Sequence, residues 1–345
     1  MAFSSYFCGC TGIVRLQYGY CRFSHPSPCD TLQGMAGGAT TTAFVTEAGG
    51  FIGTALIRRL VASGLQVYGL AGSMDVAKRV RQAGATAIIG DLLTPGQWQD
   101  EAAADWVFHL PPHPFNGSRL TELQADSIAR ARVTMDAHLL DAVAGGSTRR
   151  IVYVADASCY GATTSRAITE DAPRRPSAWG RCLVPALDRV EGYLAAGLPI
   201  VVAHPGWVYG NGSWFAARVV EPIRAGRRVL QFGKTGPWIS SIHVQDCARA
   251  LLHLAQHGEA GSQYFLVDSE PTRLHAFAET FARLTNRRLR SWRIPAAATR
   301  LVAGPVLADH VQADAVFSNI RLRGIGFRFD YPTIEEGIQQ LIGEL

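Results

Sequence analysis

Three side chains next to the ends of predicted strands could exchange protons with a bound molecule: Asp156, His109 and Tyr160. A partly buried carboxylate can have a raised pKa and act as an acid or base, and histidine titrates near neutral pH. His113 follows His109 in the same proline-rich segment, whose prolines stiffen the chain. Each residue also has a structural alternative: Asp156 could cap a turn or pair with an arginine such as Arg181, and the others could be packed or exposed. The residue types predict a proton-transfer site and leave these alternatives open.

Phosphate binding is indicated by the run Thr46-Glu47-Ala48-Gly49-Gly50-Phe51-Ile52-Gly53. It lies between a predicted strand at 43–45 and a predicted helix at 51–62. Glycines allow a tight turn and a close approach to a pyrophosphate, and the helix N-terminus offers free N–H groups and a positive dipole end. We therefore expect a dinucleotide-binding turn here.

The elements that would position these residues are short apolar strands alternating with amphipathic helices. Fully apolar strands in this alternation predict a parallel sheet covered on both faces, which binds ligands at the carboxyl ends of its strands. We predict an α/β fold, a Rossmann-type doubly wound sheet over residues 43–210. Residues 211–345 would form mainly a smaller substrate lobe, with some segments returning to the sheet. The predicted strands are 43–45, 67–70, 86–89, 106–110, 151–154 and 200–203, and the predicted helices are 51–62, 74–83, 120–143 and 178–196.

Six further motifs follow the glycine turn along the chain. They are Gly90-Asp91, Cys159-Tyr160-Gly161, His204-Pro205-Gly206-Trp207-Val208-Tyr209-Gly210, Ile242-His243-Val244-Gln245-Asp246-Cys247-Ala248, Gly261-Ser262-Gln263-Tyr264 and Gly326-Phe327-Arg328-Phe329. In this order they resemble the extended short-chain dehydrogenase/reductase family, the NAD-dependent epimerase/dehydratase family, over essentially residues 43–340. The resemblance implies a nicotinamide cofactor, NAD or NADP, bound by Gly49, Gly50, Phe51, Ile52, Gly53, Asp91 and Leu110.

The catalytic positions depart from that family. Its proton chemistry uses a Tyr-x-x-x-Lys pair and a hydroxyl residue, whereas the aligned positions here hold Trp179, Leu183 and Asp156. The chain has two lysines, Lys78 and Lys234, and neither is preceded four residues earlier by tyrosine. Tryptophan and leucine cannot act as acids or bases near neutral pH. We therefore expect chemistry without the usual Tyr/Lys pair.

The identity of the dinucleotide is left open by the sequence. The second predicted strand ends at Leu70-Ala71-Gly72-Ser73, without the acid that binds the ribose of NAD or an arginine for a 2′-phosphate. Lys78 and Arg79 could reach such a phosphate from the next helix. Glu47 stands at the first glycine position of the turn, where its charge and side chain would weaken binding.

Composition limits the class of protein. The 345 residues are 48% hydrophobic and 18% charged, which excludes global disorder, and no stretch approaches the roughly 18 apolar residues of a membrane span. The net charge of +5 is spread along the chain. The densest basic run, Arg287-Arg288-Leu289-Arg290, is interpreted as an exposed turn leading into a strand. We expect a small-molecule substrate and no nucleic acid or membrane partner; the long helices at 120–143 and 178–196 could form a homodimer.

Cysteine usage indicates a reducing compartment, so a cytoplasmic location is expected. Four of the seven cysteines lie in the first thirty residues, and Cys159, Cys182 and Cys247 are scattered. Their spacing does not suit zinc, and no metal site is predicted. Residues 1–34 show no periodicity, and we interpret 1–42 as a disordered leader or a start-site artefact.

Two functional hypotheses remain. In the first, the protein is an NAD(P)-binding enzyme that acts on a small molecule by reduction, epimerisation, dehydration or a non-redox rearrangement. Asp156, His109 and Tyr160 are then the candidate catalytic residues. In the second, it is an inactive nucleotide-binding or regulatory protein of the same fold, because the departures also permit loss of turnover.

Overall fold

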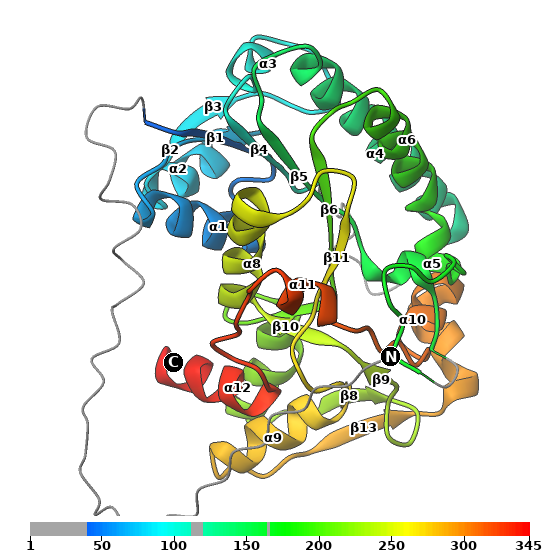
Figure 1. The fold of residues 1–345 in the computed structure, drawn as a ribbon. Coiled ribbons are helices and arrows are strands. Elements are labelled where there is room, and N and C mark those ends of the chain that lie inside the picture. Colours follow the sequence, from blue (N-terminus) through cyan, green and yellow to red (C-terminus); the bar gives the residue numbers. More distant parts are fainter. Residues whose placement is uncertain (1–39, 112–119, 164–165) are drawn as a thin grey trace, which may run out of the picture. The chain divides into compact units, whose positions relative to one another are not determined.

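Seven parallel strands form the central sheet of this protein, in the order β11-β6-β5-β4-β1-β2-β3 (Figure 1). The computed structural model describes residues 40–111, 120–163 and 166–345. The strand order reverses between β1 and β4, so the carboxyl ends open into a ligand-binding crevice at that point. The predicted Rossmann-type sheet is confirmed. The strands are β1 Thr42–Val45, β2 Gln66–Ala71, β3 Thr86–Ile89, β4 Trp106–His109, β5 Arg150–Val154, β6 Ile200–Pro205 and β11 Gln263–Leu266.

Helices cover both faces of this sheet, as Figure 1 shows. On one face, α1 (Phe51–Ala62) packs against α8 (Val244–His257), with α2 (Met74–Gln82) beside them. The other face carries α3 (Trp98–Glu101), α4 (Glu122–Val143) and α6 (Val184–Ala195). The central strands are apolar because both faces are buried; all six residues of β6 are buried.

The predicted helix over 178–196 is wrong as a continuous element. The structure has two helices there, α5 (Ala178–Arg181) and α6, separated at Cys182 and Leu183. Pro185 lies in the first turn of α6, where its missing N–H costs nothing. The same proline would break a continuous helix, because its ring clashes with the carbonyl four residues earlier.

The residues after β6 form mainly small elements around a separate apolar cluster that includes Phe215, Phe277 and Phe281. Three two-stranded sheets pair β10 with β7, β12 with β9, and β13 with β8. Strand β11 and helix α8 belong instead to the central sheet and its cover. The remaining elements are β7 Trp207–Tyr209, the π-helix η3 Ala216–Val220, α7 Glu221–Arg224, β8 Val229–Phe232, β9 Trp238–Ile239, β10 Ser241–His243, β12 Thr272–Arg273, α9 Ala276–Leu284, β13 Ser291–Ile294, α10 Ala296–His310, α11 Ile320–Gly324 and α12 Ile334–Gly343.

Helix α10 is broken at Gly304, which has φ 77° and ψ 164°. Such a positive φ is readily adopted by glycine, and Pro305 follows it without a backbone N–H. The break changes the direction of the last turns of α10. As a result Leu307 and His310 line a cavity at the strand ends.

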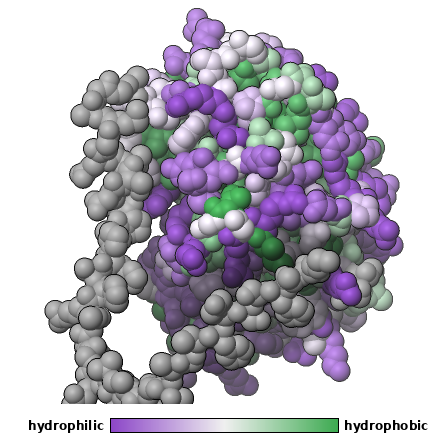
Figure 2. Space-filling view, viewed as in Figure 1, coloured by the Kyte–Doolittle hydropathy of each residue, from purple (hydrophilic) through white to green (hydrophobic). Residues whose placement is uncertain are grey.

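On the surface, hydrophilic residues cover much of the face in Figure 2, with hydrophobic residues in smaller patches. Arg287, Arg288 and Arg290 are exposed and lead into β13, as the sequence indicated. Within the described ranges, no helix is long and apolar enough to cross a membrane. The predicted leader, apart from residues 40–42, and His113 lie outside the described residues.

Candidate functional site

A cavity of about 460 Å³ opens at the carboxyl ends of β1, β5 and β6, and we call it the strand-end cavity. Phe51 and Ile52 reach it from the glycine turn, and Asp156 and Ser158 from the segment after β5. The far side is closed by residues of the C-terminal part, among them Trp207, Trp214, Leu307, His310 and Phe317. Segments far apart in the sequence therefore meet where an open α/β sheet binds its ligands.

Asp156 both caps a turn and faces this cavity. It precedes a 3₁₀ helix, η2 (Ala157–Tyr160), and its Oδ1 accepts a hydrogen bond from the backbone N–H of Ser158 at 2.8 Å. Its Oδ2 accepts a second from the indole N–H of Trp179 at 3.2 Å. Both donors stabilise the ionised carboxylate. The capping role that the sequence allowed is thus present together with the exposure to the cavity.

The contact between Trp179 and Asp156 depends on Gly180. A Cβ at position 180 would lie 2.2 Å from the carbonyl oxygen of Ser158, so only glycine lets α5 approach η2 this closely. The sequence alignment assigned Trp179 and Asp156 to the positions of the tyrosine and the hydroxyl residue. The structure brings these two residues together at the cavity wall.

Two polar residues of this cavity were missed by the sequence analysis: Ser158 and His310. The Ser158 hydroxyl is buried, and its Oγ has no hydrogen-bond partner among the described residues. His310 lies opposite at the end of α10 and stacks on Trp207, with ring centroids 5.0 Å apart. Burial lowers the pKa of His310, and the negative charge of Asp156 partly offsets this. A hydroxyl, an imidazole and a carboxylate therefore share one cavity.

His109 lies elsewhere, in a buried network that we define as Thr46, His109, Asp136, Tyr153 and Arg132. Its Nε2 lies 2.8 Å from Asp136 Oδ1 and its Nδ1 lies 3.0 Å from Thr46 Oγ1. Because a carboxylate can only accept, Nε2 donates to Asp136, while Nδ1 pairs with the Thr46 hydroxyl. The other Asp136 oxygen accepts from Tyr153, whose hydroxyl also accepts from Arg132. These surroundings favour the structural alternative for His109.

Tyr160 also faces away from the strand-end cavity. Its hydroxyl donates to Gln263 Oε1 at 2.9 Å and lies 3.3 Å from the carbonyl oxygen of Glu170. Burial raises its pKa to about 12. A hydroxyl that holds its proton so firmly is poorly suited to acid–base work near pH 7.

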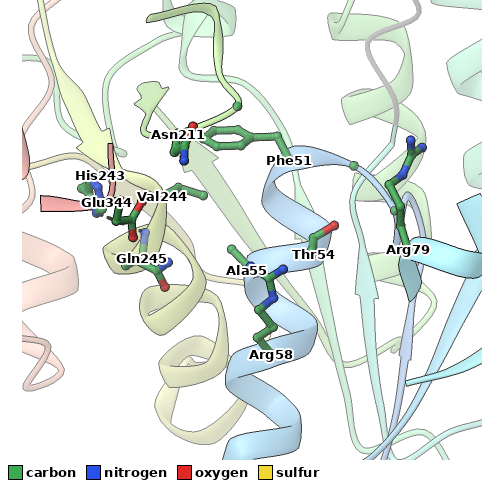
Figure 3. A pocket seen from close by; sticks show the side chains of 13 residues that line it. Phe51, Thr54, Ala55, Arg58, Arg79, Asn211, His243, Val244, Gln245 and Glu344 are labelled. Carbon is green, nitrogen blue, oxygen red and sulfur yellow. Dashed lines mark hydrogen bonds between the residues drawn. The ribbon is translucent and has the colours of Figure 1, made fainter. Parts of the chain in front are cut away.

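The glycine turn borders a second cavity of about 560 Å³, the glycine-turn cavity, which is lined by Gly49, Gly50 and Phe51 (Figure 3). Helix α1 begins there without a side-chain cap and without an acid in its first turn, so its first N–H groups are available to an anion. Arg79 and Arg58 add positive charge at the wall. The arrangement suits a pyrophosphate.

Glu47 is the unfavourable residue of this turn. Its φ of 48° is left-handed, which glycine adopts at little cost and other residues at roughly 1–2 kcal/mol. The side chain is exposed, yet the walls of the turn remove part of its solvent and raise its pKa, while Arg79 acts in the opposite direction. A Cβ at Gly50 would lie 2.9 Å from its carboxylate, so Glu47 lies directly over the turn.

Gly53, Asp91 and Leu110 were also expected to bind a cofactor. A Cβ at Gly53 would lie 2.2 Å from the carbonyl oxygen of Glu47, so Gly53 permits the turn to close on α1. Asp91 is exposed after β3 and accepts the N–H of Leu93. Leu110 is buried and donates its backbone N–H to Thr46 Oγ1 at 2.8 Å.

Cys159, Cys182 and Cys247 are buried free thiols. In the three described ranges, no group of three or more His, Cys, Asp or Glu side chains could hold a metal ion.

Comparison with known families gives a match to the model of the NAD dependent epimerase/dehydratase family over residues 43–266. Among curated proteins, the chain is 26% identical over 271 residues to a ketoreductase of Stigmatella aurantiaca. That protein is named for 4-hydroxy-2-methyl-3-oxo-4-farnesyl-3,4-dihydroquinoline-1-oxide. The alignment covers 75% of this chain and 78% of the relative.

Solved structures share the fold over most of the described chain. MoeE5 in complex with UDP-glucose and NAD is 23% identical, with a TM-score of 0.74 and coverage of 88% of this chain and 97% of that one. Human epimerase family protein SDR39U1 (isoform 2) with NADPH is 20% identical, with a TM-score of 0.73 and coverage of 88% and 100%.

Proposed function

Because this chain belongs to the NAD dependent epimerase/dehydratase family, we propose that it transfers hydride between a nicotinamide dinucleotide and the carbonyl or alcohol carbon of an apolar small molecule. The reaction would take place in the strand-end cavity. It would use Ser158, His310 and Asp156 in place of the tyrosine and lysine of the family.

The observation that carries this proposal is the buried hydroxyl of Ser158, which has no hydrogen-bond partner among the described residues, beside Asp156. Hydride transfer to a carbonyl needs a hydrogen-bond donor for the developing alkoxide and a group that supplies a proton. The Ser158 Oγ has no partner in the described residues, and Ser158 is part of the wall of the cavity that Phe51 and Ile52 reach from the glycine turn. It is therefore available to bind the reacting oxygen.

His310 would move the proton. Its lowered pKa leaves the imidazole neutral at pH 7, so it can accept the hydroxyl proton of an alcohol while the carbinol C–H leaves as hydride. The ketone forms as the O–H and C–H bonds break. Asp156 would stabilise the resulting imidazolium by its charge. Reduction is the reverse, with His310 returning the proton to the alkoxide.

A bound nicotinamide dinucleotide would supply the hydride acceptor or donor. The residues present fit such a group: the uncapped start of α1 offers N–H groups, and Gly49 and Gly50 leave room for a pyrophosphate. Arg79 would contribute positive charge. NAD and NADP both remain candidates, because the described turn after β2 carries neither an acid nor an arginine.

An apolar substrate is favoured by the walls of the strand-end cavity. Segments far apart in the chain contribute large apolar side chains, among them Leu120, Trp179, Trp207, Trp214 and Phe317. Such walls favour rings and chains over sugars, which need many hydrogen-bond partners. The ketoreductase relative is named for a substrate that bears a farnesyl group, which agrees with this preference.

The proposal is tested by three measurements on the purified full chain. Calorimetric titration with NADH and NADPH should show binding of at least one. Reduction of a panel of aryl and alkyl ketones should then consume the reduced nicotinamide, followed by its absorbance. Asp156→Asn and His310→Gln should each lower kcat by roughly 10²-fold.

His257→Gln, an exposed histidine at the end of α8, is the matched control and should retain activity. Full activity of both Asp156→Asn and His310→Gln would remove this cavity from the mechanism. A kcat whose pH dependence follows the ionisation of a tyrosine phenol would also remove this cavity from the mechanism.

Glu47 supports a second candidate, a nucleotide-binding protein without turnover. Its carboxylate lies over the turn that would hold the pyrophosphate and repels it. Dinucleotide binding without reduction of any ketone in the panel would favour this candidate.

A further inference from the structure

A third cavity of about 260 Å³ lies among β8, α9 and α10, and we call it the lobe cavity. It shares Trp207, Trp214 and Leu307 with the strand-end cavity. The two indoles meet edge to face with ring centroids 5.2 Å apart, and Trp214 is fixed by a hydrogen bond from its N–H to the carbonyl of Val208. The two cavities are therefore neighbours with a common aromatic wall.

Gln231 is the unusual residue of the lobe cavity. It is on β8 and only 4% exposed, yet neither its Nε2 nor its Oε1 has a hydrogen-bond partner among the described residues. Buried side-chain amides in folded proteins are nearly always hydrogen-bonded, because an unmet donor or acceptor costs free energy. An apolar residue of the same size would pack here without that cost.

His275 adds a second unmet group to the same wall. Its Nε2 lies 3.1 Å from the carbonyl oxygen of Phe232, which can only accept, so Nε2 carries the proton. Burial lowers the pKa of His275, and the ring is neutral with Nδ1 as an acceptor. Nδ1 is buried and has no partner in the described chain.

We propose that the lobe cavity is a binding subsite for the apolar end of the substrate, a ring or chain that carries one hydroxyl or amide group. Gln231 would bind that polar group, with His275 Nδ1 as a further acceptor for its hydrogen. This assignment rests on the proposed function, in which the reacting carbon of the same molecule lies near Ser158.

The walls argue against a nucleoside diphosphate in this subsite. Val219, Leu274, Ala278, Val302 and Val311 are apolar, and the charged residue Arg218 is exposed. A diphosphate needs several N–H donors or cations around its oxygens. A volume of about 260 Å³ instead suits a compact apolar group with one polar edge.

The test compares 2-naphthol with naphthalene as probes, because they differ by one hydroxyl group. Calorimetry on the full chain should show that 2-naphthol binds about tenfold more tightly, the usual effect of one buried hydrogen bond. Gln231→Leu should remove this preference and leave naphthalene binding unchanged. Its melting temperature should not fall, because the change removes an unmet amide from an apolar wall. Gln82→Leu, at an exposed glutamine of α2, should keep the preference.

A second variant places the probes in this cavity. Ala278 lines it from α9 and is 2% exposed, so Ala278→Leu should fill part of the space and weaken both probes at least tenfold. Equal binding of the two probes to the wild type, or a preference that persists in Gln231→Leu, would overturn the assignment. Such a result would indicate an ordered water as the partner of Gln231.

Dinucleotide titration of the same variants separates this inference from the proposed function. Gln231→Leu should bind NADH or NADPH like the wild type, because it does not touch the glycine turn. If the wild type binds no dinucleotide but still prefers 2-naphthol through Gln231, the hydride-transfer proposal fails and the subsite assignment is retained. If the dinucleotide binds and the preference for 2-naphthol is absent, the subsite assignment fails and the hydride-transfer proposal is retained.

Discussion

Behind the glycine turn, each side chain of the buried network from Thr46 to Arg132 hydrogen-bonds to another member of the network, whereas Ser158 and Gln231 at two cavities have buried polar atoms without such partners among the described residues. Asp136 accepts from both His109 and Tyr153, and Arg132 also donates to the carbonyl of Val154. Ser158 and Gln231 carry buried atoms without partners in the described chain. Residue type alone would have selected the histidine of the network for chemistry. The binding proposals rest instead on unmet hydrogen-bonding capacity beside a cavity.

The largest effect should come from breaking the network. Asp136→Ala leaves Arg132, which is 3% exposed, without its nearby negative charge, and removes the acceptor of His109 and Tyr153. We expect a loss of about 3–5 kcal/mol in the free energy of unfolding. Urea denaturation measures it. Asp126→Ala, at an exposed aspartate of the same helix, should cost less than about 0.5 kcal/mol. A loss below about 1 kcal/mol for Asp136→Ala would contradict a stabilising role of this network.

The next effect is a pH dependence of stability caused by His204, which is fully buried on β6. Burial lowers its pKa from 6.5 to about 4, although its Nε2 donates to Gln263 Oε1 at 2.8 Å. The unfolded chain therefore binds a proton between these pH values that the folded chain does not. The contribution of His204 to the free energy of unfolding is fully present above about pH 6.5. It falls by about 3 kcal/mol as the pH drops towards 4.

Unfolding free energies measured at a series of pH values would show this fall. His243, whose pKa burial also lowers to about 4, adds to the same slope. His204→Gln should make the curve shallower. An unchanged curve would mean that His204 is not buried in its neutral form.

Ser158, at the strand-end cavity, is expected to affect catalysis more than stability. Ser158→Ala removes a hydroxyl that binds nothing within the described chain, so the free energy of unfolding should change by less than about 0.5 kcal/mol. If Ser158 binds the reacting oxygen, kcat should fall by roughly 10²-fold. Steady-state kinetics with an active ketone measure this. Ser158→Thr restores the hydroxyl and should recover part of the rate; equal kcat for Ser158→Ala and wild type would exclude the role.

The smallest effect is expected at the glycine turn. Glu47→Gly relieves a left-handed backbone and removes a negative charge beside the proposed pyrophosphate, so dinucleotide affinity should rise about tenfold. Glu47→Gln removes only the charge and should give a smaller gain. Calorimetric titration compares the two. Weaker binding by both variants would show that Glu47 contributes to the site instead of opposing it.

The fold was predictable from the sequence because buried strands and amphipathic helices leave strong periodic signals. The helix predicted over about 51–62 corresponds to α1, Phe51–Ala62, and the glycines before it predicted the turn. The break between α5 and α6 was not predicted, although Pro185 signals it. The predicted helix over 178–196 extended across that proline.

Residues of the candidate site could be predicted only where a reactive side chain directly follows a predicted strand. Asp156 was predicted at the end of a strand, where the structure places it, whereas Ser158, two residues later, was overlooked despite its hydroxyl. His310 and Gln231 left no local signal. Their significance comes from a broken helix and a two-stranded sheet that bring residues far apart in sequence to the same walls. The pairing of His109 with Asp136 could not be predicted either, because Asp136 lies in the middle of a long helix.

Trp207 borders both the strand-end and the lobe cavities and stacks on His310. Any guest that tilts this indole also alters the surroundings of the imidazole, and thereby its affinity for a proton. Thermodynamic reciprocity then requires that protonation alter the affinity for the guest by the same factor. The pH and the occupancy of the apolar lobe cavity would therefore be coupled through the indole of Trp207.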